Sequence, residues 1–234
     1  MIIDTKEMDI VYFLKPSTIN EELRYSLRSL KNLPHRKVFL IGGRANWAKN
    51  VHSVGIRQFR GNKWLNVSDL LFSVVNNPTI SDDFIWFNDD FYVITPQQGL
   101  QYWHDRTLEE RIEDFTTPKR YTSTYGRRLQ RAAMSLQGNK RSTRNFELHL
   151  PMVTNRARMS VIFHRYPEIG AKRSLYCNEF NLPSTQRDDV KVYGLEEHIH
   201  PNADFASTDD RSFSYGVVGE DLKRLFPNKC IYEI

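Results

Sequence analysis

Cysteine is scarce in this sequence. The chain has only two cysteines, Cys177 and Cys230, far apart along the sequence. Two such residues cannot form a disulfide framework, and their separation does not match the ligand spacing of a zinc site. A scaffold that depends on disulfides or structural zinc is therefore excluded, and we expect a reducing compartment.

Long apolar runs are also missing. No stretch approaches the roughly 18 consecutive apolar residues of a membrane span. Residues 1–9 carry charges where a signal peptide would have its apolar region. We therefore expect no transmembrane helix and a cytoplasmic location. The 234 residues are 40% apolar and 12% aromatic, which fits a single globular domain over residues 1–234.

Acidic residues are absent from one long segment, 115–146, which holds eight Lys or Arg residues. The rest of the chain has 25 basic and 28 acidic residues, so this segment alone makes the net charge +5. It has the spacing of an amphipathic helix that begins near residues 125–126. The apolar face consists of Leu129, Ala132, Ala133 and Leu136.

Three arginines lie off that apolar face, Arg127, Arg128 and Arg131. We predict that they bind an anionic acceptor: a phosphate-bearing polymer, an acidic glycan or nucleic acid. The alternative is a basic helix face that is only solvated.

A strand–helix–strand unit is predicted near the start of the chain. Residues 10–14 and 38–41 are apolar runs typical of buried strands. Between them, Leu23, Leu27 and Leu30 fall on one helical face, with Asn20 or Thr18 as the N-cap and Pro34 as the stop. This order predicts a mainly parallel α/β sheet, whose ligands bind beyond the carboxyl ends of the strands.

Two adjacent carboxylates follow a third apolar run. Ile85-Trp-Phe87 reads as a buried strand, and Asn88-Asp89-Asp90 comes directly after it. The next Lys or Arg downstream is Arg106, so no local cation neutralises the pair. Adjacent carboxylates resist ionising together unless a cation joins them, and Mg²⁺ or Mn²⁺ prefers such oxygen ligands. We predict a metal site at Asp89 and Asp90; an acidic turn is the alternative.

Histidine provides the candidate general base. His149 lies between Leu148 and Leu150, where a half-buried neutral imidazole can accept a proton near pH 7. A packed structural histidine is the alternative. His198 and His200 are spaced to point the same way from a strand, and they are a weaker candidate for metal ligands.

Several blocks in chain order carry a family resemblance. They are Asp9-Ile-Val-Tyr12 with Asn20–Ser29, Arg36–Gly43 with Asn46-Trp47, Ile85–Asp90, His149-Leu-Pro151 with Asn155-Arg156, and Ser207–Asp210 with Leu225–Pro227 and Tyr232-Glu233. In this order they resemble the Stealth family of sugar-phosphate transferases, which includes bacterial capsule polymerases and the catalytic subunit of GlcNAc-1-phosphotransferase. The Asn20–Ser29 block is the most specific of them.

The resemblance implies a fold of glycosyltransferase-A type and a nucleotide-sugar donor, commonly UDP-linked. Asp89 and Asp90 would hold the metal, while Arg24 or Arg28 would clamp phosphate oxygens with a planar guanidinium. Arg173 matches a basic position of the family and would touch phosphate as part of the catalytic set. Further donor-binding positions implied by the matched blocks are Asp9, Tyr12, Asn20, Glu21 and Gly43.

The sequence therefore predicts a metal-dependent enzyme that moves a sugar or sugar 1-phosphate from a nucleotide sugar to a hydroxyl of an anionic acceptor. His149 and Asp90 are its central residues, and the segment at about 115–146 is an acceptor-side insertion. Two alternatives stay open. One is a DNA glycosyltransferase acting on hydroxylated bases, and the other is a non-enzymatic nucleic-acid-binding protein on a transferase scaffold.

Overall fold

A computed structural model describes residues 1–15, 19–58, 63–117 and 122–234. Its main sheet has five strands in the order β3-β2-β1-β4-β7. The pairs β1–β2, β1–β4 and β2–β3 are parallel, and only β7 runs antiparallel, against β4. The mainly parallel α/β sheet predicted from the sequence is therefore confirmed.

The strands of this sheet follow the predicted apolar runs. Every residue of β1 and β2 is buried, as is the central part of β4, because the sheet is covered on both faces. The strands are β1 (Asp9–Phe13), β2 (Val38–Ile41), β3 (His52–Val54), β4 (Asp83–Asn88) and β7 (Met152–Asn155).

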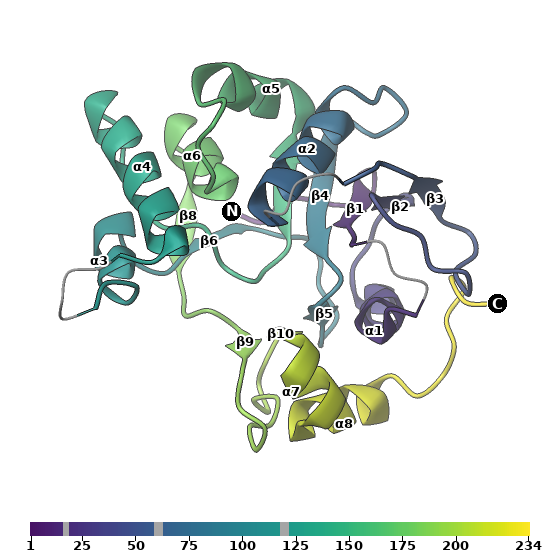
Figure 1. The fold of residues 1–234 in the computed structure, drawn as a ribbon. Coiled ribbons are helices and arrows are strands. Elements are labelled where there is room, and N and C mark those ends of the chain that lie inside the picture. The colour runs from purple at the N-terminus through teal and green to yellow at the C-terminus, as the bar shows by residue number, and fades with distance from the viewer. Residues whose placement is uncertain (16–18, 59–62, 118–121) are drawn as a thin grey trace.

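Helices cover the sheet on both sides. In the view of Figure 1, α2 and α5 lie above the row of strands and α1 lies below it. Helices α3 and α4 pack against each other, and α6 packs against α4 and α5. The helices are α1 (Glu21–Ser29), the short 3₁₀ helix η1 (Leu30–Asn32), α2 (Lys63–Val75), α3 (Leu108–Glu113), α4 (Thr124–Gly138), α5 (Arg156–Arg165), α6 (Lys172–Glu179), α7 (Asp210–Tyr215) and α8 (Val217–Leu225).

A smaller sheet extends the molecule below the carboxyl end of β4 (Figure 1). It has the order β5-β10-β9, and α7 and α8 lie beside it. A second apolar cluster, with Tyr92, Phe213 and Leu222, holds these elements together. The remaining strands are β5 (Phe91–Val93), β9 (Lys191–Val192) and β10 (Phe205–Thr208), and a separate parallel pair, β6 (Tyr102–His104) with β8 (Ser184–Gln186).

Two sequence predictions about helices are confirmed in detail. Asn20 is the N-cap of α1, and its side-chain oxygen accepts a hydrogen bond from the amide of Leu23; the alternative cap, Thr18, lies outside the described residues. The α-helix ends at Ser29 and η1 follows it, so the helical region stops just before Pro34.

Helix α4 has the buried face that its spacing predicts, formed by Gly126, Leu129, Ala132, Ala133 and Leu136. Leu129, Ala132, Ala133 and Leu136 belong to the main core cluster. The basic segment is therefore anchored in the core. No helix among the described residues is long and apolar enough to cross a membrane.

The strand order creates a switch point in the main sheet. From β1 the chain moves outward through β2 and β3, and it then returns to the other side of β1 to form β4. In such sheets the crevice between the carboxyl ends of the two diverging strands is the usual ligand site. Asn88, Asp89 and Asp90 leave β4 at this point.

Candidate active site

The acidic pair lies in the turn that joins β4 to β5. Both carboxylates are half-buried, and each has a partner from a distant part of the chain. The side-chain amide of Asn20 donates to Asp89 Oδ2 at 2.7 Å, and Lys191 Nζ donates to Asp90 Oδ2 at 2.6 Å. The sequence showed no local cation, but the fold brings Lys191 to Asp90.

Asn20 serves both the helix and the site. Its side-chain oxygen caps α1 while its NH₂ group donates to Asp89. Ser, Thr and Asp also cap helices, but they lack the second function because none of them offers an amide donor. The N-terminus of α1, with its partial positive charge, therefore lies against the acidic turn.

A further carboxylate, which sequence reasoning missed, joins the acidic pair. Glu22, in the first turn of α1, accepts a hydrogen bond from Thr208 Oγ1 at 2.8 Å. Burial, together with the charges of Asp90 and Asp89, raises the pKa of Glu22 to about 8. Burial and the charge of Asp90 likewise raise the pKa of Asp89 to about 6. The protein thus gathers more acidic groups here than can ionise together at neutral pH.

His149 forms a hydrogen-bonded pair with Asp189. Its Nδ1 lies 2.6 Å from Asp189 Oδ2, and its backbone amide donates to Asp189 Oδ1 at 2.9 Å. Burial works against ionisation of Asp189, but the hydrogen bond and charge of His149 lower the pKa of this carboxyl below its ordinary value. A carboxylate at Nδ1 leaves Nε2 as the nitrogen that can accept a proton.

One short segment links this pair to the acidic turn. Asp189 holds His149, and two residues later Lys191 holds Asp90. The imidazole also packs edge-on against Phe91, the residue that follows Asp90, with ring centroids 6.3 Å apart. A candidate base and a candidate cation site therefore lie side by side at the switch point of the sheet.

Two predicted donor-binding residues do not belong to this site. Asp9 is fully buried at the amino end of β1, where Arg36 donates two hydrogen bonds to it at 2.8 and 2.6 Å. This is the edge of the sheet opposite to Asp89, since Asp9 pairs with Phe84 at the start of β4. Tyr12 is also fully buried, and its hydroxyl bonds to Ser26 Oγ. Neither side chain lies at the switch point, because both polar groups complete the core.

The predicted phosphate clamp on α1 is largely occupied by the C-terminal block. Arg28 is buried and makes a two-pronged contact with Glu233, with Nε–Oε1 at 2.7 Å and NH2–Oε2 at 2.9 Å. Arg24 NH1 reaches the same carboxylate at 2.9 Å, and its Nε pairs with the exposed Glu21. Arg28 and Glu21 are therefore structural residues, while Arg24 keeps a partly exposed guanidinium stacked on Trp47.

Arg173 also has a structural role instead of the predicted contact with phosphate. It is buried, and its NH1 donates to the carbonyl oxygens of Leu148 and Leu150, on either side of His149. Its guanidinium packs over Trp86 at 4.7 Å. Arg173 therefore positions the loop that carries His149.

The other predicted residues are arranged as follows. Gly43 follows β2 at the carboxyl edge of the sheet, and it must be glycine because a Cβ would lie 2.6 Å from the carbonyl oxygen of Lys15. On α4, Arg127 and Arg131 are exposed, and Arg127 bonds to Thr122 and Thr124. Arg128 turns toward the Trp64 ring, with its guanidinium carbon 4.5 Å from the ring centroid.

The two weaker histidine candidates make contacts away from the acidic turn. His198 pairs with Asp221 on the surface, and His200 accepts a hydrogen bond from the amide of Asn202. Within residues 1–15, 19–58, 63–117 and 122–234, no three His, Cys, Asp or Glu side chains are grouped as a complete metal site.

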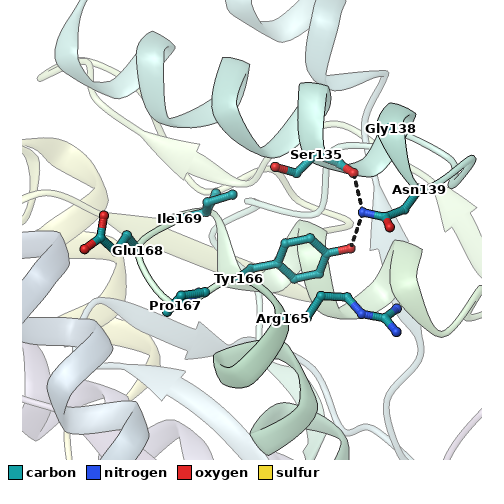
Figure 2. Close-up of a pocket in the computed structure, with 8 residues that line it drawn as sticks. All are labelled: Ser135, Gly138, Asn139, Arg165, Tyr166, Pro167, Glu168 and Ile169. Carbon is teal, nitrogen blue, oxygen red and sulfur yellow. Dashed lines mark hydrogen bonds between the residues drawn. The ribbon is translucent and has the colours of Figure 1, made fainter.

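A wide groove of about 710 Å³ lies elsewhere, between the end of α4 and the loop after α5. Figure 2 shows Asn139 bridging its wall by donating to the carbonyl of Ser135 and to the hydroxyl of Tyr166. The groove is lined by residues outside the predicted site: Ser135, Gly138, Asn139, Arg165, Tyr166, Pro167, Glu168 and Ile169.

No protein-family model and no curated protein matches the sequence. Among solved structures, the chain is similar to the glycosyltransferase GlyE of Streptococcus pneumoniae TIGR4, with a TM-score of 0.34 and 9% identity. The match covers 79% of this chain and 46% of that chain, so this chain spans about half the length of GlyE. A TM-score of this size supports no inference about function, and membership of the Stealth family stays a prediction.

Proposed function

We propose that this protein transfers a sugar or a sugar 1-phosphate from a nucleotide sugar, UDP-linked by the family resemblance, to a hydroxyl of an anionic acceptor. The observation that carries the proposal is that one short segment, 189–191, contacts both the candidate base and the acidic turn. Asp189 orients the imidazole of His149, while Lys191 is bound to Asp90. Transfer from a nucleoside diphosphate sugar needs a base for the acceptor hydroxyl and a cation for the diphosphate. The imidazole can supply the first, and the acidic turn can bind the second.

Asp89 and Asp90 would hold a divalent cation, Mg²⁺ or Mn²⁺, which neutralises the charge of the donor diphosphate. The residues fit this role because Asp90 Oδ1 is buried without a hydrogen-bond partner among the described residues, and Lys191 occupies only the other oxygen. Magnesium sites often use one or two carboxylates and take their remaining ligands from phosphates and water.

His149 is the proposed general base. The acceptor hydroxyl gives its proton to Nε2 while its oxygen forms a new bond to the donor, and the bond to the leaving nucleotide breaks. Asp189 then stabilises the resulting imidazolium through Nδ1. If the oxygen attacks the sugar-proximal phosphorus, a nucleoside monophosphate leaves; if it attacks the anomeric carbon, a nucleoside diphosphate leaves.

The contacts between the resemblance blocks support the finer proposal of a Stealth-like transferase. Asn20, which opens one block, donates to Asp89 in a second, and Arg28 at the end of the first binds Glu233 in the last. Three of the segments that carry the resemblance are thus in contact with one another. This family type would release a nucleoside monophosphate.

Identification of the nucleotide product after incubation with a panel of nucleotide sugars and Mn²⁺ tests the proposal. We expect one donor to be consumed, and His149→Ala is the matched control because it removes the base and leaves both carboxylates. A monophosphate product favours sugar-phosphate transfer, and a diphosphate product favours glycosyl transfer. Binding of nucleic acid with no turnover of any nucleotide sugar would contradict the enzyme and favour a binding protein.

A further inference from the structure

An arginine packs against two aromatic rings at the start of α4. The guanidinium carbon of Arg128 lies 4.5 Å from the ring centroid of Trp64 and 5.6 Å from that of Tyr125. The two rings are themselves stacked, with centroids 6.2 Å apart and planes at 30°. We call Trp64, Tyr125 and Arg128 the Arg128 clamp. Aromatic faces attract a cation, and they also restrict its orientation.

The charge of Arg128 has no directly bonded partner. Its Nε and NH1 are buried with no hydrogen-bond partner. Within the described part of the chain no carboxylate forms an ion pair with it, although the charge of Glu147 acts on it from a distance and favours the charged guanidinium. The stretches outside that part, 16–18, 59–62 and 118–121, contain no Asp or Glu. Burial lowers the pKa of Arg128, yet a guanidinium stays protonated in proteins. An unpaired buried charge is costly, so this arrangement calls for an external anion.

One nitrogen of Arg128 can reach a ligand. NH2 is the nitrogen that is not among the buried, unpartnered atoms. Gly170 lies against the Nε–NH2 side of the guanidinium, where an added Cβ would collide with both nitrogens. The glycine therefore leaves the room that the guanidinium occupies.

The clamp is connected to the loop of the candidate base by packing. Helix α4, which carries Tyr125 and Arg128, packs against α6. Arg173 of α6 donates to the carbonyl oxygens of Leu148 and Leu150, on either side of His149. An anion bound at the clamp would therefore lie on the α4 side of the proposed active site.

We propose that the Arg128 clamp binds a phosphate group of the acceptor. A guanidinium N–H donates well to phosphate oxygens, and NH2 is the donor that Arg128 keeps accessible. Arg128 makes this contact, whereas Arg127 and Arg131 lie on the exposed side of α4. The assignment of this phosphate to the acceptor rests on the proposed transferase function. Phosphate binding at the clamp does not, because it requires neither donor nor metal.

The experiment compares thermal unfolding in sodium phosphate and in sodium chloride of equal ionic strength, without donor or metal, and measures phosphate affinity by calorimetry. The parent protein should be stabilised specifically by phosphate. Arg128→Met should weaken phosphate binding about 10- to 100-fold, the range for loss of charged hydrogen bonds. Arg131→Met, the matched control on the exposed face of α4, should bind phosphate within about twofold of the parent, as expected for a screened surface charge.

Gly170→Ala provides a second variant that keeps every charge. Its Cβ should push the guanidinium out of the clamp and weaken phosphate binding, even if Arg128→Met fails to fold. The proposal is overturned if the parent responds to phosphate as it does to chloride, if Gly170→Ala binds phosphate as the parent does, or if Arg131→Met loses as much affinity as Arg128→Met. If phosphate binding depends on Arg128 but no nucleotide sugar is turned over, the proposed transferase function is refuted. The proposal that the clamp binds phosphate is then still supported.

Discussion

Replacing Glu233 by Gln should strongly destabilise the fold, because this carboxylate is the anchor of α1. It is buried and accepts hydrogen bonds from Arg28 Nε, Arg28 NH2 and Arg24 NH1 at 2.7 to 2.9 Å. Burial opposes its ionisation, but these arginines and the amide of Cys230 lower the pKa of Glu233 from 4.5 to about 2. At about 1.4 kcal/mol per pH unit, that difference corresponds to about 3 kcal/mol of stability at pH 7.

The pH dependence has a definite sign. Because the folded pKa of Glu233 lies below its unfolded value of 4.5, its stabilisation is present above pH 4.5 and disappears as the pH falls toward 2. The difference in unfolding free energy between the parent and Glu233→Gln should therefore shrink from about 3 kcal/mol at pH 7 to about 2 kcal/mol at pH 3.5. Urea denaturation at these two pH values measures it.

Glu21→Gln is the matched control for this measurement. Glu21 pairs with the same Arg24, but its side chain is 46% exposed, so its loss should cost less than about 1 kcal/mol. A loss below about 1 kcal/mol for Glu233→Gln, or a difference that does not change with pH, would refute the reasoning. Arg28 would then be available for a ligand, as the sequence had suggested.

His149→Ala should lower kcat by ~10²–10⁴ with donor affinity unchanged. If calorimetry shows that donor binding is lost instead, His149 has a role in binding or in the core and is not the general base. Asp189→Asn should lower kcat by a smaller factor of ~10–100, because the imidazole keeps its place but loses a charged partner. Asp90→Asn, or excess EDTA, should nearly abolish turnover, and full activity in EDTA would contradict the metal. Asn20→Asp keeps the helix cap but opposes Asp89, whose pKa is about 6, so its metal-free melting temperature should fall more at pH 8 than at pH 5. Asn20→Ser, a cap without charge, should show no such pH difference.

The central secondary structure could be predicted because its signals are local. The strands β1, β2 and β4 are apolar runs, and the cap and apolar face of α1 lie within a few residues of one another. The same holds for α4, where the buried residues recur at helical spacing. In each case neighbouring side chains decide the conformation, so a sequence pattern is sufficient.

The ionic contacts of the site could not be predicted in the same way. Lys191 and Asp90 are 101 residues apart, and Arg28 and Glu233 are 205 residues apart. Such pairs depend on which strand ends meet, which no local pattern reveals. For this reason the local sequence indicates a phosphate-binding role for Arg28 and shows no cation near Asp90.

One missed residue did have a signal. Glu22 lies in the first turn of a helix that starts at the carboxyl edge of a parallel sheet, so its side chain faces the predicted ligand site. Asp189 and Lys191 offered no comparable signal, because they lie in an irregular segment that ends in the two-residue strand β9.

The close spacing of Asp189 and Lys191 also limits where the chain can accept an inserted residue. Lys191 pairs with Ser207 of β10, and successive residues of a strand point to opposite faces. One inserted residue between Asp189 and Lys191 would turn the ammonium group away from Asp90 or pull the carboxylate away from His149. Insertions in the irregular loop 194–203 leave both contacts in place. In a library of single-residue insertions, active variants should therefore be found in that loop and be absent between residues 189 and 191.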